Sequence, residues 1–391
     1  MTLSEAEVHE ALLGIDDPDL CRGIEELGMV RQVRVKRRSV SVLVALPVAG
    51  WDGQEAIERL VGEAVGRLEG VGEVHVAFEV MSDSERADLR RRLLAERGGL
   101  PGGIMAAGGH DDQGAPAPLG HEEGRPNRFM IPGSRTRVIG VSSGKGGVGK
   151  SSVTVNLAVA LAAKGYQVGL LDADVYGFSV PKMLGVTHDP TSVDNLLVPP
   201  VVHGVRCLSM GFFVPDDQPV IWRGPMLHKA LEQFLVDAYW GDPDFLLLDM
   251  PPGTGDVALS LGQYLPRTEM LVVTTPQPAA QRVAQRSAYA AKRLKLPVRG
   301  VVENLSWFTG DDAKRYELFG SGGGRMLADE LGVPLLGQIP LLPAVRLGAD
   351  DGVPVLVGEP GGEAARAFDT LADAVVALGP TRIYRKELSV R

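Results

Sequence analysis

Cysteine is scarce in this chain: only Cys21 and Cys207 occur in 391 residues. Two cysteines cannot build a disulfide framework and suit a reducing compartment, so we expect a cytoplasmic protein. No run of eighteen apolar residues occurs, so we expect no membrane span. The N-terminal stretch MTLSEAEVHEALL is acidic and lacks the pattern of a signal peptide.

Positive charge is also in short supply, because 40 lysines and arginines face 49 aspartates and glutamates, which gives a net charge of −9. This balance argues against broad affinity for nucleic acid, and we expect no specific nucleic-acid partner. Apolar residues, in contrast, make up 45% of the chain and are enough for extended cores. The length favours two or three domains.

Composition and periodicity divide the chain into four parts. Residues 1–97 predict a small α+β domain, and residues 98–134, rich in glycine, proline and alanine, predict a flexible linker. Residues 135–380 alternate strands and helices, and 381–391 make a basic tail. Most strands in the third part are continuous apolar runs, as parallel strands buried on both faces should be. We therefore expect a doubly wound α/β domain with a mostly parallel sheet and ligands at the carboxyl ends of its strands.

One stretch, SSGKGGVGKSS at 142–152, fits the phosphate-binding pattern G-x-x-x-x-G-K-[ST]. An apolar strand precedes it and a helical pattern follows it, which is the context that a P-loop requires. Backbone N–H groups of such a loop wrap phosphates, and glycine leaves room for that approach. The predicted nucleotide-binding residues are Gly144, Lys145, Gly146, Gly147, Val148, Gly149, Lys150, Ser151 and Ser152.

Acidic residues end two of the predicted strands. Asp249 follows the run LLL, where a carboxylate can hold Mg²⁺ together with Ser151 of the loop. Asp172 and Asp174 follow another apolar strand. One of these two can orient an attacking water while the other supports Mg²⁺, and the sequence does not choose between them. We list Asp172 both as a catalytic and as a magnesium candidate, and Asp174 as a catalytic candidate.

The stretch GKGGVGKS resembles the deviant Walker A motif of the ParA/MinD/iron-protein class of P-loop ATPases. In that class the early lysine reaches the nucleotide of the second subunit in a homodimer. The resemblance therefore implies a catalytic role across the dimer for Lys145, and a phosphate-binding role within the subunit for Lys150. An extra cation would stabilise the phosphoryl-transfer transition state, as an arginine finger does.

Other stretches, among them DADVYGFSVPKMLG, LLLDMPPGTGDVALSL and FGSGGGRMLADELGVPLLGQIPL, are similar to the Mrp/ApbC branch of this class. The first segment, with DDPDLCRGIEELGMV, is similar to the MIP18-like domain often fused ahead of that branch. The resemblance implies a cytosolic homodimeric, Mg²⁺-dependent ATPase that carries iron–sulfur clusters to client apoproteins, with a [4Fe–4S] cluster bridging the dimer. It also implies that Asn304 reads the adenine edge.

The sequence departs from that family at the cluster site. Cluster-carrying members have C-x-x-C soon after the strand that ends in ENLS, whereas residues 306–320 here, SWFTGDDAKRYELFG, contain no cysteine. Asp311 and Asp312 are hard oxygen donors that replace thiolates poorly. The MIP18-like domain often has a cysteine after its hairpin, near the position where this chain has Trp51. The candidate cluster ligands that are left are Cys21 and Cys207, and we expect Cys207 to be a buried small hydrophobe. A metal-free ATP-dependent scaffold and a ParA/MinD-like positioning switch are the alternatives.

Overall fold

The computed structural model describes residues 3–94, 127–130, 134–174, 177–214, 224–253 and 256–381, with the side chains of 224–225 and 256–258 left out. The predicted linker, 98–134, lies almost entirely outside these ranges. The predicted tail, 381–391, lies outside them except for its first residue. By their contacts the described residues form two compact units, which are taken separately below.

The second unit contains residues 125–187, 202–236 and 243–391. Its centre is an eight-stranded sheet in the order β10-β11-β7-β12-β6-β13-β14-β17, and from β11 to β17 every neighbouring pair is parallel. These strands are β6 (Arg137–Ser143), β7 (Val168–Asp172), β10 (Val201–Val202), β11 (Val205–Ser209), β12 (Phe245–Asp249), β13 (Glu269–Thr274), β14 (Val298–Glu303) and β17 (Leu335–Gln338). The doubly wound, mostly parallel α/β fold expected from the apolar runs is confirmed.

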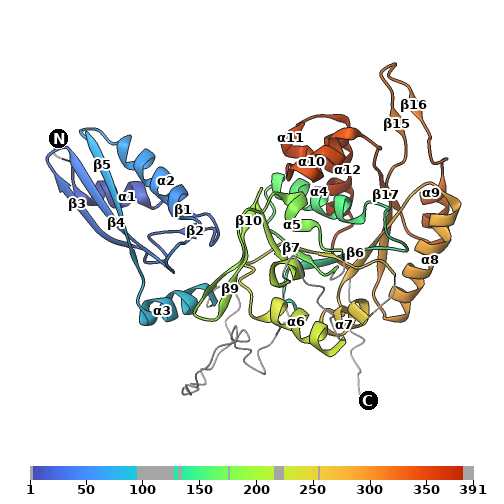
Figure 1. The fold of residues 1–391 in the computed structure, drawn as a ribbon, viewed down its shortest axis with the longest axis horizontal. Coiled ribbons are helices and arrows are strands. Elements are labelled where there is room, and N and C mark those ends of the chain that lie inside the picture. The colour runs from blue at the N-terminus through green and yellow to red at the C-terminus, as the bar shows by residue number, and fades with distance from the viewer. Residues whose placement is uncertain are drawn as a thin grey trace, which may run out of the picture. The chain divides into compact units, whose positions relative to one another are not determined.

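Helices cover both faces of this sheet (Figure 1). Helices α4 and α12 pack against each other on one side, while α6 and α7 lie together on the other. The helices of the unit are α4 (Lys150–Ala163), α5 (Val180–Leu184), α6 (Gly224–Val236), α7 (Asp256–Tyr264), α8 (Pro278–Arg293), α9 (Gly323–Leu331), α10 (Pro343–Asp351), α11 (Val355–Gly358) and α12 (Glu363–Ala377). Two short 3₁₀ turns, η1 (Arg128–Met130) and η2 (Met210–Phe213), and a hairpin of β15 (Phe308–Thr309) and β16 (Arg315–Tyr316) complete it.

Helix α4 is buried almost all the way round, because it lies between the sheet and α12. Val153 and Leu157, four residues apart, share one face of this helix. Both residues are buried, but so are Thr154 and Asn156 on the other sides. The run of small and apolar residues in α4 therefore marks a central helix rather than an amphipathic surface helix.

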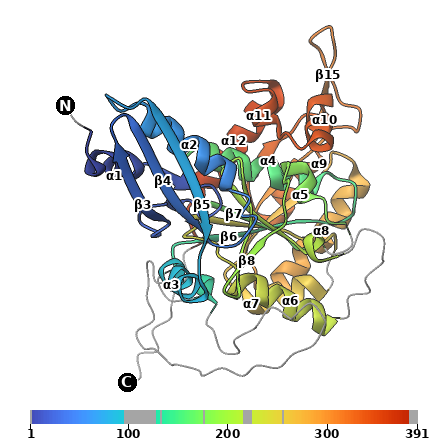
Figure 2. The same ribbon diagram turned by 60° about the vertical axis from the view of Figure 1, so that its left-hand side comes forward.

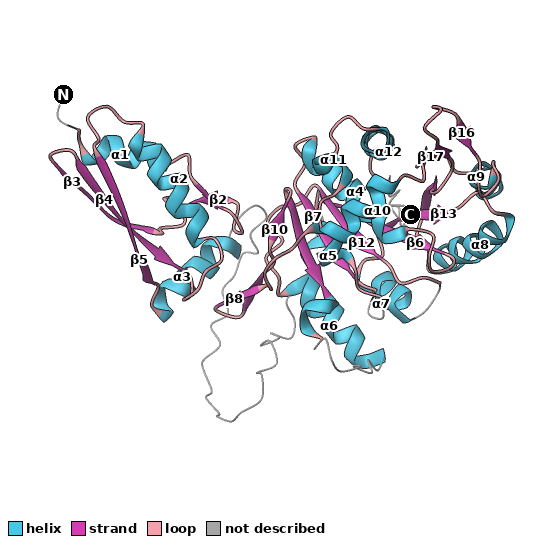
Figure 3. Ribbon diagram, turned by 45° about the horizontal axis from the view of Figure 1, so that its top comes forward, coloured by secondary structure: helices cyan, strands magenta, loops and turns pink. Residues whose placement is uncertain are grey.

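The first unit holds the small α+β domain expected at the N-terminus, with a three-stranded sheet in the order β3-β4-β5 (Figures 2 and 3). Strands β3 and β4 form an antiparallel hairpin, and β5 runs parallel to β4. Its elements are α1 (Glu5–Leu12), β1 (Asp16–Asp17), β2 (Arg22–Gly23), β3 (Val30–Lys36), β4 (Ser39–Leu46), α2 (Gln54–Gly66), β5 (Glu73–Val80) and α3 (Asp83–Leu94).

Two segments from the middle of the sequence also belong to the first unit, namely residues 188–201 and 237–242. The first forms a small antiparallel pair, β8 (Thr191–Val193) and β9 (Leu196–Val198). Val193, Leu196 and Tyr239 are buried in the same apolar cluster as the N-terminal residues. The Tyr239 hydroxyl donates to the carbonyl of Leu20 at 3.3 Å. Apolar burial of these side chains stabilises the packing of both segments on the N-terminal core, although the sequence places them within residues 135–380, the predicted α/β domain.

Candidate functional site

The loop 144–149 connects the end of β6 to the start of α4. Gly147 and Gly149 have φ angles of 79° and 78°, a left-handed conformation that L side chains rarely adopt. Gly149 is the N-cap of α4 and has no side-chain acceptor for the first-turn N–H groups. Those N–H groups, together with the helix dipole, suit an anion such as a phosphate.

Two glycines of the loop are fixed by close neighbours. A side chain at Gly144 would overlap the α8 backbone at Val283 and Ala284, and one at Gly149 would overlap the amide of Asn304. Asn304 is buried, and its Nδ2 donates to the carbonyl of Val148 at 2.9 Å. The structure therefore places Asn304 against the back of the phosphate loop, where it holds the loop backbone. Its role in reading adenine stays a prediction.

The ammonium of Lys150 lies at the centre of the site. Lys150 Nζ is 2.6 Å from Asp249 Oδ2, 3.3 Å from Ser151 Oγ and 3.7 Å from Asp174 Oδ2. The Ser151 hydroxyl also donates to Asp249 Oδ2 at 2.6 Å. The lysine is thus held by carboxylates at the position from which it can donate to phosphate oxygens. Ser151 and Asp249, two of the predicted magnesium ligands, are in direct contact, and both are oxygen donors of the kind that Mg²⁺ prefers. Their role in holding Mg²⁺ stays a prediction.

Sequence reasoning missed Thr154, whose hydroxyl donates to Asp249 Oδ1 at 2.7 Å. Its position one helical turn after Lys150 was the available signal, since residues four apart share a helix face. Asp249 is fully buried, yet each of its oxygens accepts a hydrogen bond. These bonds offset the cost of burying its charge.

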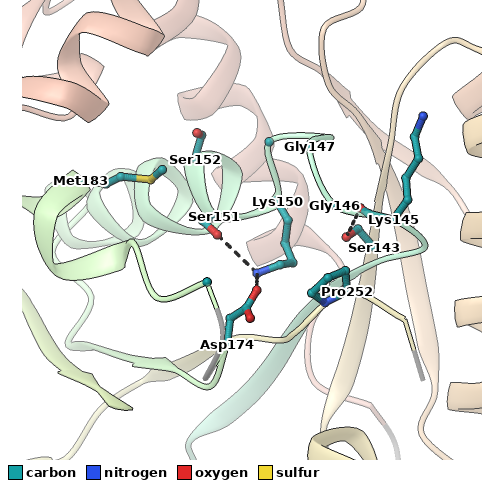
Figure 4. A pocket seen from close by; sticks show the side chains of 12 residues that line it. Ser143, Lys145, Gly146, Gly147, Lys150, Ser151, Ser152, Asp174, Met183 and Pro252 are labelled. Atoms are coloured by element: carbon teal, nitrogen blue, oxygen red, sulfur yellow. Dashed lines mark hydrogen bonds and ion pairs between the residues drawn. The ribbon is translucent and has the colours of Figure 1, made fainter. Parts of the chain in front are cut away.

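A cavity of about 230 Å³ opens at the loop (Figure 4). In Figure 4 the side chain of Lys145 extends away from the ammonium of Lys150. Within the part of the chain that the structure describes, the Lys145 ammonium makes no hydrogen bond or ion pair. The cavity is lined by Ser143, Lys145, Gly146, Gly147, Gly149, Lys150, Ser151, Ser152, Asp174, Gly177, Met183 and Pro252.

The two candidates at the end of β7 have different surroundings. Asp172 is fully buried, and its Oδ2 accepts from the N–H groups of Ser179 and Val180, at 3.2 and 3.3 Å, and from the Ser209 hydroxyl at 3.1 Å. Its Oδ1 accepts from the N–H of Asp174 at 3.1 Å. Burial, with the negative charge of Asp249 nearby, raises the pKa of Asp172 to about 7.

Asp174, by contrast, lines the cavity beside Lys150, and burial raises its pKa above the ordinary value. Its carboxylate points toward the ammonium of Lys150 (Figure 4). Asp174 is thus the one that faces the cavity, while the hydrogen bonds of Asp172 hold the backbone between β7 and α5. The catalytic roles of both residues and the magnesium role of Asp172 stay predictions.

The two cysteines also differ in their exposure to solvent. Cys207 lies in β11, is fully buried, and has a thiol pKa raised by that burial, which disfavours the thiolate needed for metal binding. Its expected role as a small buried hydrophobe is confirmed. Cys21 is exposed, with a φ angle of 52°, and its thiol donates to the carbonyl of Pro18 at 3.4 Å. Among the described residues no group of three or more His, Cys, Asp or Glu side chains could hold a metal ion.

At the two positions where the resembled families carry cysteine, this chain has a buried tryptophan and an exposed hairpin. Trp51 is buried and donates from its indole nitrogen to Asp17 Oδ2 at 2.8 Å. The segment after β14 forms the β15–β16 hairpin, in which the Tyr316 hydroxyl donates to Asp312 Oδ2 at 2.8 Å. The Trp307 indole donates to Glu363 Oε1 at 2.9 Å. Aromatic side chains and their hydrogen bonds therefore stand where the resembled families carry thiolates.

A phosphate loop with its lysine and serine on the carboxylate of a parallel strand defines a P-loop nucleotide-binding protein. The chain belongs to the family described as NUBPL iron-transfer P-loop NTPase, which matches residues 134–376. Residues 5–76 match a second family, described as Iron-sulfur cluster assembly protein. The resemblance found in the sequence is thereby confirmed for both parts of the chain.

Named relatives cover nearly the whole chain. The Iron-sulfur cluster carrier protein of Mycobacterium tuberculosis strain H37Rv is 44% identical over 377 residues, which is 95% of this chain and 92% of that protein. The protein of the same name from Bacillus subtilis is 40% identical and covers 87% of this chain and 88% of its own length. A nucleotide-binding protein from Archaeoglobus fulgidus, solved in complex with ADP, matches 60% of this chain and 92% of its own, with 32% identity and a TM-score of 0.52.

No helix of the described residues is long and apolar enough to cross a membrane, in line with the sequence. The cytoplasmic location stays a prediction from composition.

Because Asp174 and Asp172 have different surroundings, we expect their substitutions to have different effects. Asp174→Asn should bind ATP and unfold at the wild-type temperature, but turn ATP over more slowly, by about a hundredfold. Asp172→Ala should lower the melting temperature, because it leaves three buried N–H groups and a hydroxyl without an acceptor, at a cost of about 1–3 kcal/mol. Calorimetry and phosphate release measure both. Wild-type turnover in Asp174→Asn, or an unchanged melting temperature in Asp172→Ala, would contradict the assignment.

Proposed function

We propose that this chain is an ATP-dependent carrier or assembly factor for iron–sulfur clusters, which it delivers to apoproteins as a homodimer. One observation carries the proposal. The lysine, serine and carboxylate of a phosphate and magnesium site lie together, at 2.6 Å for both Lys150 and Ser151 to Asp249, in a chain 44% identical to a named iron–sulfur cluster carrier over 95% of its length. The site supplies the nucleotide part of the function, and the relatives indicate the cargo.

Each residue of the site has a task in ATP hydrolysis. Lys150 would donate to phosphate oxygens that replace the Asp249 contact, while Ser151 and Asp249 would hold Mg²⁺. Bound Mg²⁺ supplies positive charge that offsets the charge of the phosphates. Asp174 would orient the attacking water from the far wall of the cavity, and Asp172 would keep the loop of Asp174 in place.

Lys145 is the residue that links hydrolysis to dimer formation. Its side chain extends away from its own Lys150, and its ammonium has no partner in the described part of the chain. A cation in this position can stabilise the transition state in a second copy of the chain, which would make hydrolysis depend on the dimer.

Mixing two inactive variants tests this arrangement. Lys150→Ala and Lys145→Ala homodimers should each hydrolyse ATP at about a hundredth of the wild-type rate or less, because each lacks one cation at every site. In the mixed dimer one site has Lys150 from one copy and Lys145 from the other. Mixing should therefore restore a large share of the activity, measured as phosphate release. No recovery in dimers shown to exchange subunits would contradict a role across the dimer.

This chain has too few accessible cysteines to hold a cluster by itself. A [4Fe–4S] cluster takes four cysteine ligands, and a dimer of this chain has four cysteines, of which the two Cys207 thiols are buried. The pair of Cys21 side chains is left to hold a cluster. The other coordination positions would then be open to thiolates of a client, an arrangement that suits transfer rather than storage.

Anaerobic reconstitution with iron and sulfide tests the carrier function. The full chain should take up iron and sulfide in a fixed ratio per dimer and show the visible absorbance of a cluster. Cys21→Ala should lose both, while Cys207→Ala is the matched control and should keep them. Iron counting and absorbance are the measurements.

A second function, an ATP-dependent scaffold without a cluster, rests on the cysteine-free β15–β16 hairpin. If the reconstituted wild-type chain holds no specific iron while its ATPase activity is intact, the carrier proposal fails and this second function replaces it.

A further inference from the structure

Helix α8 and the residues just after it differ in charge from the rest of the chain. The stretch 278–295, PAAQRVAQRSAYAAKRLK, contains basic side chains and no aspartate or glutamate, in a chain of net charge −9. One face of α8 consists of small buried residues that pack on β13, β6 and β14. Basic residues at 282, 286 and 293 share the opposite, exposed face, since spacings of four and seven keep residues on one side of a helix.

We call the exposed basic residues Arg282, Arg286, Lys292 and Arg293 the basic stripe. From its first to its last residue the stripe runs roughly 16 Å along the helix axis. Figures 1 and 3 show α8 beside α9 at the edge of the second unit, with its outer side uncovered by other described elements.

The arginines of the stripe lack the acidic partners that other helices provide. In α3, Arg86 and Arg91 pair with aspartates three residues earlier, and in α10 Arg346 pairs with Asp350 at 2.6 Å. Within the described ranges, Arg282 and Arg286 make no ion pair or hydrogen bond.

The same holds for Arg293 among the described residues. Glu330 of α9 accepts from the amide of Gln285, and Lys292 donates to the carbonyl of Leu331 at 3.3 Å. Like charges four apart on a helix repel, so the stripe costs stability until an acidic group meets it.

Apolar groups accompany these charges. The Tyr289 side chain lies between Arg286 and Arg293 on the same face, and its residue is 46% exposed. On α9, Met326 is 60% exposed, one turn before Glu330. Exposed aromatic and methionine side chains next to arginines are typical of protein interfaces, whereas a phosphate backbone offers nothing apolar for them to bury.

We propose that the basic stripe is a docking surface for an acidic protein partner, which places carboxylates against Arg282, Arg286 and Arg293 and an apolar side chain on Tyr289. Bidentate pairing with carboxylates is what arginine does best. The inference goes beyond the proposed carrier function and holds whether or not this chain binds a cluster itself.

Helix α8, which carries the stripe on its exposed face, packs with its backbone against the phosphate loop. The backbone at Val283 and Ala284 lies so close to Gly144 that no side chain fits there. Gly144 is the first residue of the phosphate loop and precedes Lys145. A partner that shifts α8 therefore shifts the loop, and by thermodynamic reciprocity nucleotide binding changes the affinity for the partner by the same factor.

Binding of two labelled probes tests the proposal on the full chain. The first is a fluorescein-labelled helical peptide with glutamates four residues apart and leucines on the adjoining face, and the second is a labelled DNA duplex of random sequence. By fluorescence anisotropy the wild type should bind the peptide, more weakly as salt rises, and R282E/R286E/R293E should bind it about tenfold more weakly or worse. R282Q/R286Q/R293Q should lie between the two, which guards against a folding defect in the reversed variant.

The matched control reverses the same number of charges elsewhere. Lys36, Arg37 and Arg38 are exposed in the turn between β3 and β4 of the first unit. K36E/R37E/R38E should bind the peptide like the wild type. If this control lost as much affinity for the peptide, binding would depend only on the net charge of the chain, and the proposal would be overturned. So would a wild type that ignores the peptide, or one that binds the duplex through the stripe and not the peptide.

Discussion

The carboxylate of Asp249 is the interaction on which the nucleotide site depends. It ends a fully buried strand and accepts hydrogen bonds from Lys150, Ser151 and Thr154, all on the first two turns of α4. A buried carboxylate without such donors would be costly, so the strand end and the helix start fix each other. That contact fixes the end of the loop between β6 and α4, while α8 and Asn304 hold the rest of it. Lys150 is presented to the cavity because its ammonium is already held there.

The parts of this site that a local motif encodes could be predicted from the sequence. The phosphate loop, its lysine and serine, and the aspartate at the end of β12 each follow from a few adjacent residues. The task of Asp172 could not be predicted, because its partners Ser179 and Ser209 come from other elements that only the fold brings together. The burial of Val193 and Tyr239 in the N-terminal core could not be predicted either, because these residues are far in sequence from the core that they join. The sequence shows the basic residues of α8, but only the folded structure shows that its arginines have no acidic partners among the described residues.

The chain has a complete set of side chains for binding a nucleotide but an incomplete set for holding an iron–sulfur cluster. The phosphate-binding site has the side chains that a P-loop protein needs, in contact with one another. For a cluster the chain offers one exposed cysteine, and Trp51 and the β15–β16 hairpin stand where the resembled families carry thiolates. Under the proposed carrier function, a partner would have to supply further ligands. A docking surface on α8, against the phosphate loop, would let the nucleotide state decide when such a partner is held.

The most direct test of this account is the magnesium dependence of ATP binding, measured by titration calorimetry on the wild type, Asp249→Asn and Asp174→Asn. If Asp249 organises the site, Mg²⁺ should raise the affinity of the wild type and of Asp174→Asn for ATP. In Asp249→Asn that gain should fall by about tenfold or more, because the amide cannot replace the carboxylate beside Ser151. An undiminished gain with Mg²⁺ in Asp249→Asn would contradict the central role given to this carboxylate.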